Sequence, residues 1–364
     1  MPSERQTVGQ FLEYWLEHVA RRRVRPLTLR SYEDRIRLHI TPTLGPIPLS
    51  KLTAQRVQGW LNERLTGGAS PQSCRYSRAV LRAALSYAVR WGLVVQNAAA
   101  LGEVPRSVKP EIRPFNPEQA KVFLAAAAGH RLEALFSVGL ALGLRQGEAL
   151  GLTWGDVDLD AAVLHVRHTL QRVGGDRVRL RALRRDWKSL QAKLTFASDG
   201  ERPALEAERK QLWGQIRAVR RVFTLAEPKS SRSRRSINMP AIVVTALRAH
   251  RVRQLQERLA AGGKRHDQGL VFTTRVGTPI DPRAVTAAFH KLTDDSELPS
   301  IRYHDLRHTA ATLLLAQGVS PRTIMETLGH SQISLTLDTC SHVLPALTQE
   351  AADRMNAILT GSGS

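Results

Sequence analysis

Apolar residues recur every three or four positions through the first hundred residues, with polar residues between them. Four segments show this pattern and are separated by proline or glycine: residues 8–20, 28–40, 53–66 and a longer one that begins at Pro71. A period near 3.6 is typical of amphipathic helices that bury one face. This part of the chain is therefore predicted to be a compact helical unit.

A polar stretch interrupted by three prolines, residues 101–115, follows this unit and is typical of a linker. We therefore expect one domain over residues 1–100 and a second over residues 116–360. Helical spacing dominates the second domain as well. Short segments that alternate between apolar and polar residues predict three strands there, at residues 162–168, 223–227 and 235–239.

An additional pair of helical patterns lies between the first and second predicted strands. Leucine and tryptophan recur at helical spacing on both sides of Ser198, Asp199 and Gly200, so residues 177–220 predict an antiparallel helical hairpin with charged outer faces. The hairpin could contact DNA, contact another protomer, or be a solvated insertion without a role. Its cations are Arg181, Arg184, Arg185, Lys188 and Lys193.

The charge of the chain indicates the class of its partner. Lys and Arg number 53 against 32 Asp and Glu, a formal net charge of +21. Such an excess favours a polyanionic partner, above all nucleic acid. Apolar runs are too short for a membrane span and the first residues lack a signal-peptide core, so we expect a soluble cytoplasmic protein. Cys74 and Cys340 have neither a disulfide framework nor zinc-ligand spacing.

The densest group of candidate functional residues lies within residues 301–343. His304 and Arg307 stand three apart where the apolar spacing of residues 303–317 is helical, so both would lie on one helix face. A serine, a proline and a later glycine predict a second short helix that closes just before His330. The segment thus gathers cationic side chains at helix ends and on one helix face.

These motifs resemble the catalytic domain of the tyrosine recombinases, the phage-integrase family. HDLRH, LGHS and TLDTCSHV follow one another in the order of that family, and ALGLRQGEALGLTW and EPKSSRSRRSINMP match its upstream motifs. The four helices at the start are similar to its SAM-like core-binding domain. The implied fold is mainly α with a small β-sheet: a helical SAM-like core-binding domain plus a tyrosine-recombinase catalytic domain, here carrying the helical-hairpin insertion.

The resemblance implies roles for seven residues. Arg145 and Arg307 would bind the non-bridging oxygens of the scissile phosphate, and Lys229, on a β-hairpin between the second and third predicted strands, would protonate the leaving 5′ oxygen. Guanidinium groups suit this task because a pentacoordinate phosphorus concentrates negative charge on those oxygens. The other positions are His304 and His330, which would donate hydrogen bonds to the phosphate, Glu148, which would orient the site, and Cys340, at the nucleophile position.

Cys340 stands where the family has its nucleophilic tyrosine. A thiol beside arginines has a lowered pKa, but sulfur is a soft nucleophile for phosphorus and the side chain is shorter than that of tyrosine. We interpret Cys340 as a disabling replacement, and the terminal GSGS is consistent with an edited sequence. A natural inactive relative and a working thiol nucleophile are the alternatives.

The function implied by the resemblance is site-specific DNA recombination or integration by transesterification, through a covalent 3′-phosphoprotein and a Holliday junction. The expected partners are double-stranded DNA core sites and three further copies of the chain in a tetramer on synapsed DNA, with weak or no self-association without DNA. A bacterial or phage origin follows from the same resemblance. No cofactor or metal is expected, because arginines supply the positive charge.

A second function class is a non-cleaving helix-turn-helix DNA-binding protein. Residues 318–329 alone match such a motif. This alternative accounts for one turn and two helices, but it leaves Arg145, Lys229 and the HDLR motif without a role.

Overall fold

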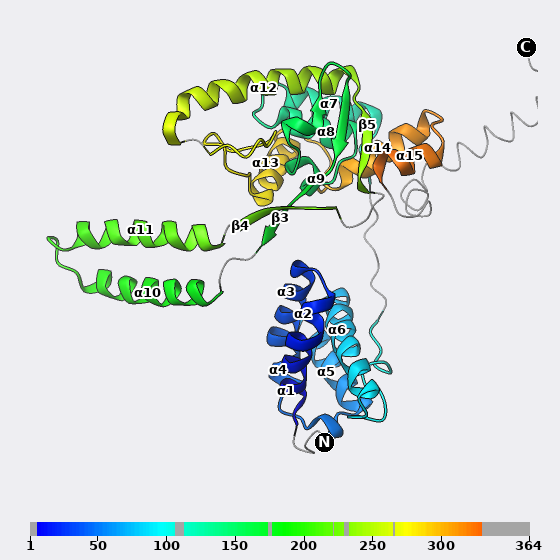
Figure 1. Ribbon diagram of the computed structural model, residues 1–364, viewed down its shortest axis with the longest axis vertical. Helices are drawn as coiled ribbons and strands as arrows, with labels where there is room; N and C mark the ends of the chain where they lie inside the picture. Colours follow the sequence, from blue (N-terminus) through cyan, green and yellow to red (C-terminus); the bar gives the residue numbers. More distant parts are fainter. Residues whose placement is uncertain are drawn as a thin grey trace, which may run out of the picture. The chain divides into compact units, whose positions relative to one another are not determined.

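The computed structural model describes residues 6–105, 113–173, 177–220, 222–228, 233–264 and 266–329 (Figure 1). The chain divides into two compact units, Met1–Pro110 and Glu111–Ser364. Each unit has a hydrophobic core of its own. The predicted fold class, mainly helical with small sheets, is confirmed.

The regular elements in the described part of the first unit are all helices. The third and fourth predicted helices begin at side-chain caps: Thr53 accepts a hydrogen bond from the backbone of Arg56, and Ser70 accepts one from the backbone of Ser73. The elements are α1 (Val8–Trp15), η1 (Leu16–Ala20), α2 (Arg21–Arg23), α3 (Pro26–Arg35), η2 (Ile36–Ile40), α4 (Thr41–Leu44), η3 (Leu49–Lys51), α5 (Ala54–Thr66) and α6 (Pro71–Arg90).

The first two predicted helices continue further than their apolar pattern indicated. A π-helical segment joins α1 to α2, and another joins α3 to α4. Pro42 does not end the second helix, because η2 runs directly into α4 and the helix continues as far as Leu44. The apolar faces meet in one core, in which Phe11, Ile40 and Trp60 are fully buried.

The second unit is built around α8 (Glu133–Ala141), whose residues are buried from Ala134 to Leu140 without interruption. An aromatic cluster surrounds it: the ring centroids of Phe123 and Phe289 lie 5.5 Å apart, and those of Phe136 and Phe289 lie 6.1 Å apart. The other helices are α7 (Pro117–Ala127), α9 (Gln146–Leu150), η4 (Trp154–Asp156), α12 (Ala241–Ala261), η6 (Gly262–Lys264), α13 (Pro282–Asp295), α14 (Asp305–Ala316) and α15 (Pro321–Leu328).

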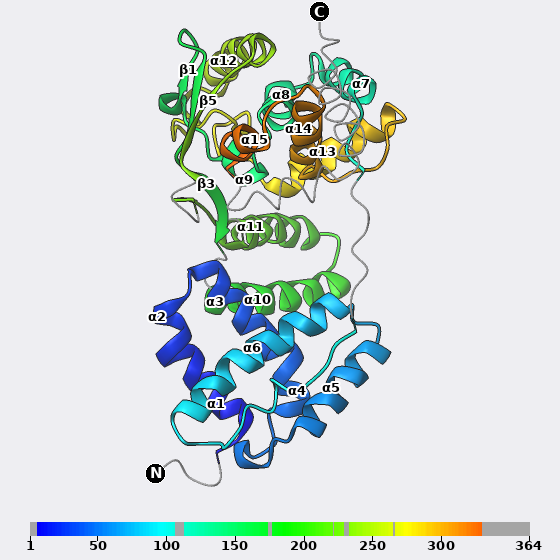
Figure 2. The same cartoon turned by 90° about the vertical axis from the view of Figure 1, so that its right-hand side faces the viewer.

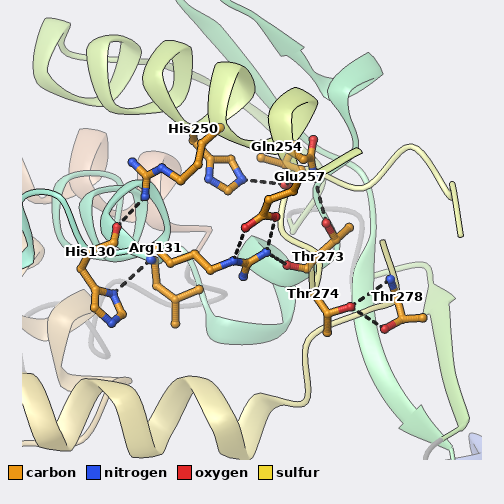
Figure 3. Close-up of polar contacts among 11 residues, drawn as sticks. His130, Arg131, His250, Gln254, Glu257, Thr273, Thr274 and Thr278 are labelled. Carbon is orange, nitrogen blue, oxygen red and sulfur yellow. Dashed lines mark hydrogen bonds and ion pairs between the residues drawn. The ribbon is translucent and has the colours of Figure 1, made fainter. Parts of the chain in front are cut away.

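A polar network attaches the long helix α12 to the rest of this unit (Figure 3). Arg131 donates two hydrogen bonds of 2.7 Å to the carboxylate of Glu257 and one of 2.7 Å to the Thr273 carbonyl. Gln254 donates to the Thr273 hydroxyl at 3.1 Å. A bidentate arginine–carboxylate pair restricts geometry as well as adding energy, so α12 has a defined position on the core.

The strands pair differently from the prediction. The prediction that the second and third strands pair with each other in a hairpin was wrong. These strands are β4 and β5, and they pair with β3 and β2, which precede the predicted helical hairpin in the chain. An extra strand, β3, follows β2 after two residues and supplies the partner of β4. The antiparallel pairs are β1 (Val157–Asp158) with β2 (Val163–Val166), β2 with β5 (Arg235–Asn238), and β3 (Thr169–Val173) with β4 (Val222–Ala226).

Two antiparallel helices connect β3 to β4: α10 (Arg177–Phe196) and α11 (Arg202–Arg220) lie side by side in both views (Figures 1 and 2). Leu183, Leu190 and Ile216 are buried there, yet they lie outside the main core of the unit. The rings of Trp187 and Trp213 pack with centroids 5.2 Å apart. The helical pair therefore has a small core of its own.

Within the described ranges, none of the helices is both long enough and apolar enough to cross a membrane.

Candidate active site

Arg145 and Glu148 form a unit at the start of α9. Arg145 Nη1 donates to Glu148 Oε1 at 2.6 Å, and the backbone N–H of Arg145 donates to Oε2 at 3.1 Å. The carboxylate thereby satisfies an open N–H at the helix start, as in a capping box. The Glu148 side chain is 4% exposed and that of Arg145 is 39% exposed, so the guanidinium remains accessible at the site surface.

A second arginine, Arg235, reaches the same carboxylate from β5. Its Nη2 lies 3.2 Å from Glu148 Oε2, and its Nε donates to the Thr327 carbonyl of α15 at 2.6 Å. The side chain is 7% exposed. Sequence reasoning did not select Arg235, because it is one of several cations in a basic segment. One signal was available: Arg235 is two positions from buried Ile237 on β5, and residues two apart share a strand face. That spacing indicates that the Arg235 side chain points inward.

Arg307 lies in α14 and is 2% exposed. Its Nη1 donates to the Gly143 carbonyl at 2.9 Å. Gly143 has a φ of +60°, and a Cβ there would overlap the Leu328 side chain. Glycine therefore lets the backbone turn so that its carbonyl meets Arg307 and α15 packs closely against the turn.

His304 immediately precedes α14, at the N-cap position, instead of lying inside the helix as predicted. Its ring lies 5.4 Å from that of His308, between centroids. Partial burial and the nearby His308, Arg307 and Arg145 lower the pKa of His304 to about 4. The ring is therefore neutral at pH 7 and can donate one hydrogen bond and accept another.

Several positive charges lie close to the Glu148 carboxylate. Burial alone would raise the pKa of Glu148, but Arg235 and Arg145 outweigh burial and hold that pKa below its ordinary value. Burial and the neighbouring Arg145 lower the pKa of Arg307 to about 9, so its guanidinium is still charged at pH 7. Two of these guanidinium groups bind the Glu148 carboxylate, and the third, that of Arg307, lies close enough for Arg145 and Arg235 to lower its pKa. A bound anion would relieve the repulsion among the three.

The described residues bring together four of the seven predicted site residues: Arg145, Glu148, His304 and Arg307. Arg145 Nη2 also donates to the Gly329 carbonyl at 3.3 Å, which ties the end of α15 to the site. The other three, Lys229, His330 and Cys340, lie outside the described residues. Among the described residues, no group of His, Cys, Asp and Glu could hold a metal ion.

Two family models match the chain in the order of its two units. The model described as "Phage integrase, N-terminal SAM-like domain" matches residues 7–65, and that of the "Phage integrase family" matches residues 209–345. The first match falls within the helical first unit. The second includes β5 and α14, which contribute Arg235 and Arg307 to the site.

Full-length relatives agree with these matches. A "Tyrosine recombinase XerC-like" protein of Caldanaerobacter subterraneus is 28% identical over 360 residues, which cover 96% of this chain and 83% of the relative. An "Integrase" of Saccharopolyspora erythraea is also 28% identical, over 385 residues that cover 98% of this chain and 83% of the relative. The similarity therefore extends over both units.

Solved structures share the fold at lower sequence identity. The Tn1549 transposon integrase in complex with transposon right end DNA aligns with a TM-score of 0.71 and 20% identity, over 96% of this chain and 100% of the other. A lambda integrase dimer bound to a COC′ core site aligns with a TM-score of 0.59 and 17% identity, over 92% and 95%. With both units matched in order, the chain belongs to the phage integrase family of tyrosine recombinases.

Proposed function

We propose that this protein is a site-specific DNA recombinase, in which Arg145, Arg307 and His304 bind the phosphate to be cleaved. The observation that carries the proposal is the cluster of arginines that the fold brings together around Glu148. Among the described residues, three guanidinium groups gather around one carboxylate, and the side chains of Glu148, Arg235 and Arg307 are buried. A phosphodiester supplies one negative charge, and its pentacoordinate transition state carries more, so such a site favours the transition state.

The chemistry is a transesterification without an external energy source. A protein nucleophile attacks phosphorus, its bond to phosphorus forms as the bond to the 5′ oxygen breaks, and a protein-bound 3′ phosphate results. We assign the proton for the leaving oxygen to Lys229 and hydrogen bonds to the phosphate to His304 and His330. Attack by the 5′ hydroxyl of a second strand reverses these steps. Exchange of both strands of two duplexes uses four copies of the site, so we propose a tetramer on DNA.

Cys340 limits the first step, since its position corresponds to the nucleophile. We propose that the chain as it stands binds its DNA but cleaves it poorly, because the phosphate-binding groups are in place and the phenol is not. The names of the similar proteins, which include a putative prophage integrase and a transposon integrase, support a role in a mobile element. Such a role would place the protein with bacterial DNA in the cytoplasm.

The helix-turn-helix alternative has less support from α15. Its Ile324 and Leu328 are buried, and its exposed side carries an ion pair of 3.2 Å between Arg322 and Glu326. The carbonyls of Thr327 and Gly329, at its end, accept hydrogen bonds from Arg235 and Arg145. A non-cleaving protein would have no need for this attachment or for the buried charge of Arg307.

Restoration of the phenol tests the proposal. Duplexes would first be selected from a random library by binding to the chain, and then labelled and incubated with Cys340→Tyr protein. A denaturing gel should show a covalent protein–DNA band that leaves a free 5′ hydroxyl. The matched control is Cys340→Phe, which has the same ring without the hydroxyl, and Arg307→Gln in the Cys340→Tyr background should remove the band. Binding without any covalent band from Cys340→Tyr would favour the non-cleaving alternative.

A further inference from the structure

The helical pair α10–α11 carries a one-sided charge distribution. Residues 177–196 contain seven Lys and Arg but one Asp, whereas residues 202–220 contain five Lys and Arg and two Glu. Four of the α10 cations follow the spacing i, i+3, i+4 and i+7, which places them on one helix face. These four are Arg181, Arg184, Arg185 and Lys188, and all are exposed. We call them the α10 stripe.

The α10 stripe points away from the helix that α10 packs against. Leu183 and Leu190 of α10 are buried, and both lie on the opposite side of the helix from Arg181 and Lys188 at 100° per residue. The stripe is therefore not used to hold the two helices together. Its cations are available to a partner outside the hairpin.

The alternative explanation for the exposed charges is a solvated helix face without a partner. On other helices of this chain, exposed cations form ion pairs with acidic residues one turn away. Arg21 pairs with Glu17 at 2.8 Å, and Lys291 pairs with Asp295 at 2.8 Å, both at i, i+4 spacing. The four residues of the α10 stripe make no ion pair within the described ranges. Neighbouring like charges on one helix face destabilise the helix, so the stripe has a cost that a partner would offset.

The spacing of the stripe matches a nucleic-acid backbone. Residues 181–188 span about 10 Å along the helix axis at 1.5 Å per residue. Duplex DNA carries one negative charge for roughly each 1.7 Å of its axis, so several phosphates lie within reach of such a stripe. Flexible cations without a fixed acceptor favour contact with phosphate over the reading of base edges.

The strand topology connects the stripe to the candidate active site. Arg235, which binds Glu148, lies on β5, and β5 pairs with β2. Strand β3 continues β2 after two residues, and its pairing with β4 leads directly into α10 and α11. The helical pair thus connects the two strands of the β3–β4 sheet, which lies along the chain between β2 and β5, the strand that carries Arg235.

We propose that the α10 stripe binds the phosphate backbone of the DNA duplex next to the site of strand exchange. This inference rests on the proposed recombinase function and adds a contact surface to it. The hairpin would act as an arm that increases affinity without adding sequence preference. A second copy of the chain is a poorer partner for this face, because two identical basic stripes repel each other.

The experiment compares two variants with four charges removed from each helix. Arg181, Arg184, Arg185 and Lys188 become glutamine in the α10 variant, and Arg202, Arg209, Lys210 and Arg217 become glutamine in the α11 variant. Affinity for a selected duplex is measured as a function of salt concentration, and the footprint on that duplex is mapped. Circular dichroism and thermal unfolding of both variants check that the hairpin is intact.

Each lost phosphate contact should reduce the slope of log affinity against log salt by about 0.9. We expect the α10 variant to lose about two to four such contacts and part of the footprint on one flank. The α11 variant should keep the salt dependence and the footprint of the parent. Equal slopes and footprints for parent and α10 variant would overturn the inference while leaving the recombinase proposal intact. The inference would also be overturned if the α10 variant bound DNA as the parent does but lost self-association. A parent chain that binds no DNA would overturn both proposals.

Discussion

Arg145 and Arg235 bind opposite oxygens of one buried carboxylate, that of Glu148, at 2.6 Å and 3.2 Å. Arg145 is also bonded to the Gly329 carbonyl, and Arg235 to the Thr327 carbonyl, so both arginines attach the end of α15 to the start of α9. Arg145 is exposed enough to meet a phosphate, whereas Arg235 is enclosed. The two arginines therefore have different roles. Arg145 can bind substrate, and Arg235 can position Glu148 and the end of α15.

Replacement of Arg235 should separate positioning from DNA binding. In the Cys340→Tyr background, we expect Arg235→Gln to lower the rate of covalent complex formation by about 10²-fold, the order of loss that a misplaced catalytic group causes. DNA affinity should change by less than about threefold, because Arg235 is buried. Arg234→Gln, one position earlier and exposed, is the control and should have neither effect. An equal loss of affinity and rate would show that Arg235 contacts DNA directly.

Glu148→Gln should destabilise the second unit in a pH-dependent way. The pKa of Glu148 is lowered in the folded protein, so its carboxylate contributes stability above the ordinary pKa of 4.5, and that contribution is lost as pH falls through the folded value. Removal of one partner from a buried ion pair costs about 3–5 kcal/mol. Urea unfolding at pH 7 should therefore show a large difference between parent and variant, and the difference should shrink below pH 4.5. A constant difference from pH 7 to pH 3 would contradict this assignment.

Gly143→Ala tests the turn that presents a carbonyl to Arg307. The alanine would have a φ of +60° and its Cβ would overlap Leu328, so we expect strain from the backbone and from packing together. Gly129→Ala is the matched control, because Gly129 also has a positive φ, of +74°, but no atom lies within 4 Å of the added Cβ. Thermal unfolding should show a larger loss of stability for Gly143→Ala than for Gly129→Ala. Equal losses would mean that backbone strain alone accounts for the effect.

Deletion of the helical pair should leave the rest of the second unit folded. Leu183, Leu190 and Ile216 are buried apart from the main core, so replacement of residues 177–220 by a short Gly-Ser turn removes little packing from that core. We expect unfolding of the shortened chain to remain cooperative. Its covalent complex formation in the Cys340→Tyr background should persist at low salt and fail at lower salt concentrations than the parent. Non-cooperative unfolding would show that the hairpin belongs to the core.

Several features of this protein follow from local sequence. The helix starts at Thr53 and Ser70 are predictable, because a side-chain oxygen satisfies open N–H groups of its own first turn. The helical pair is predictable from apolar spacing on both sides of a short polar turn. The family resemblance comes from motif order, which is also a property of the sequence. Each of these signals depends on residues only a few positions apart.

The tertiary structure decided what depends on residues far apart in the chain. Alternation predicted strands β4 and β5, but a strand does not specify its partner, and β3 and β2 occupy the positions that a hairpin would have filled. Arg235 became recognisable as a site residue only when β5 was placed against Glu148, 87 positions earlier. The roles of Lys229, His330 and Cys340 remain predictions from motif order. The gathering of three arginines around one carboxylate could not be predicted from local sequence either. Charge, burial and hydrogen bonding act through space between segments that the fold brings together.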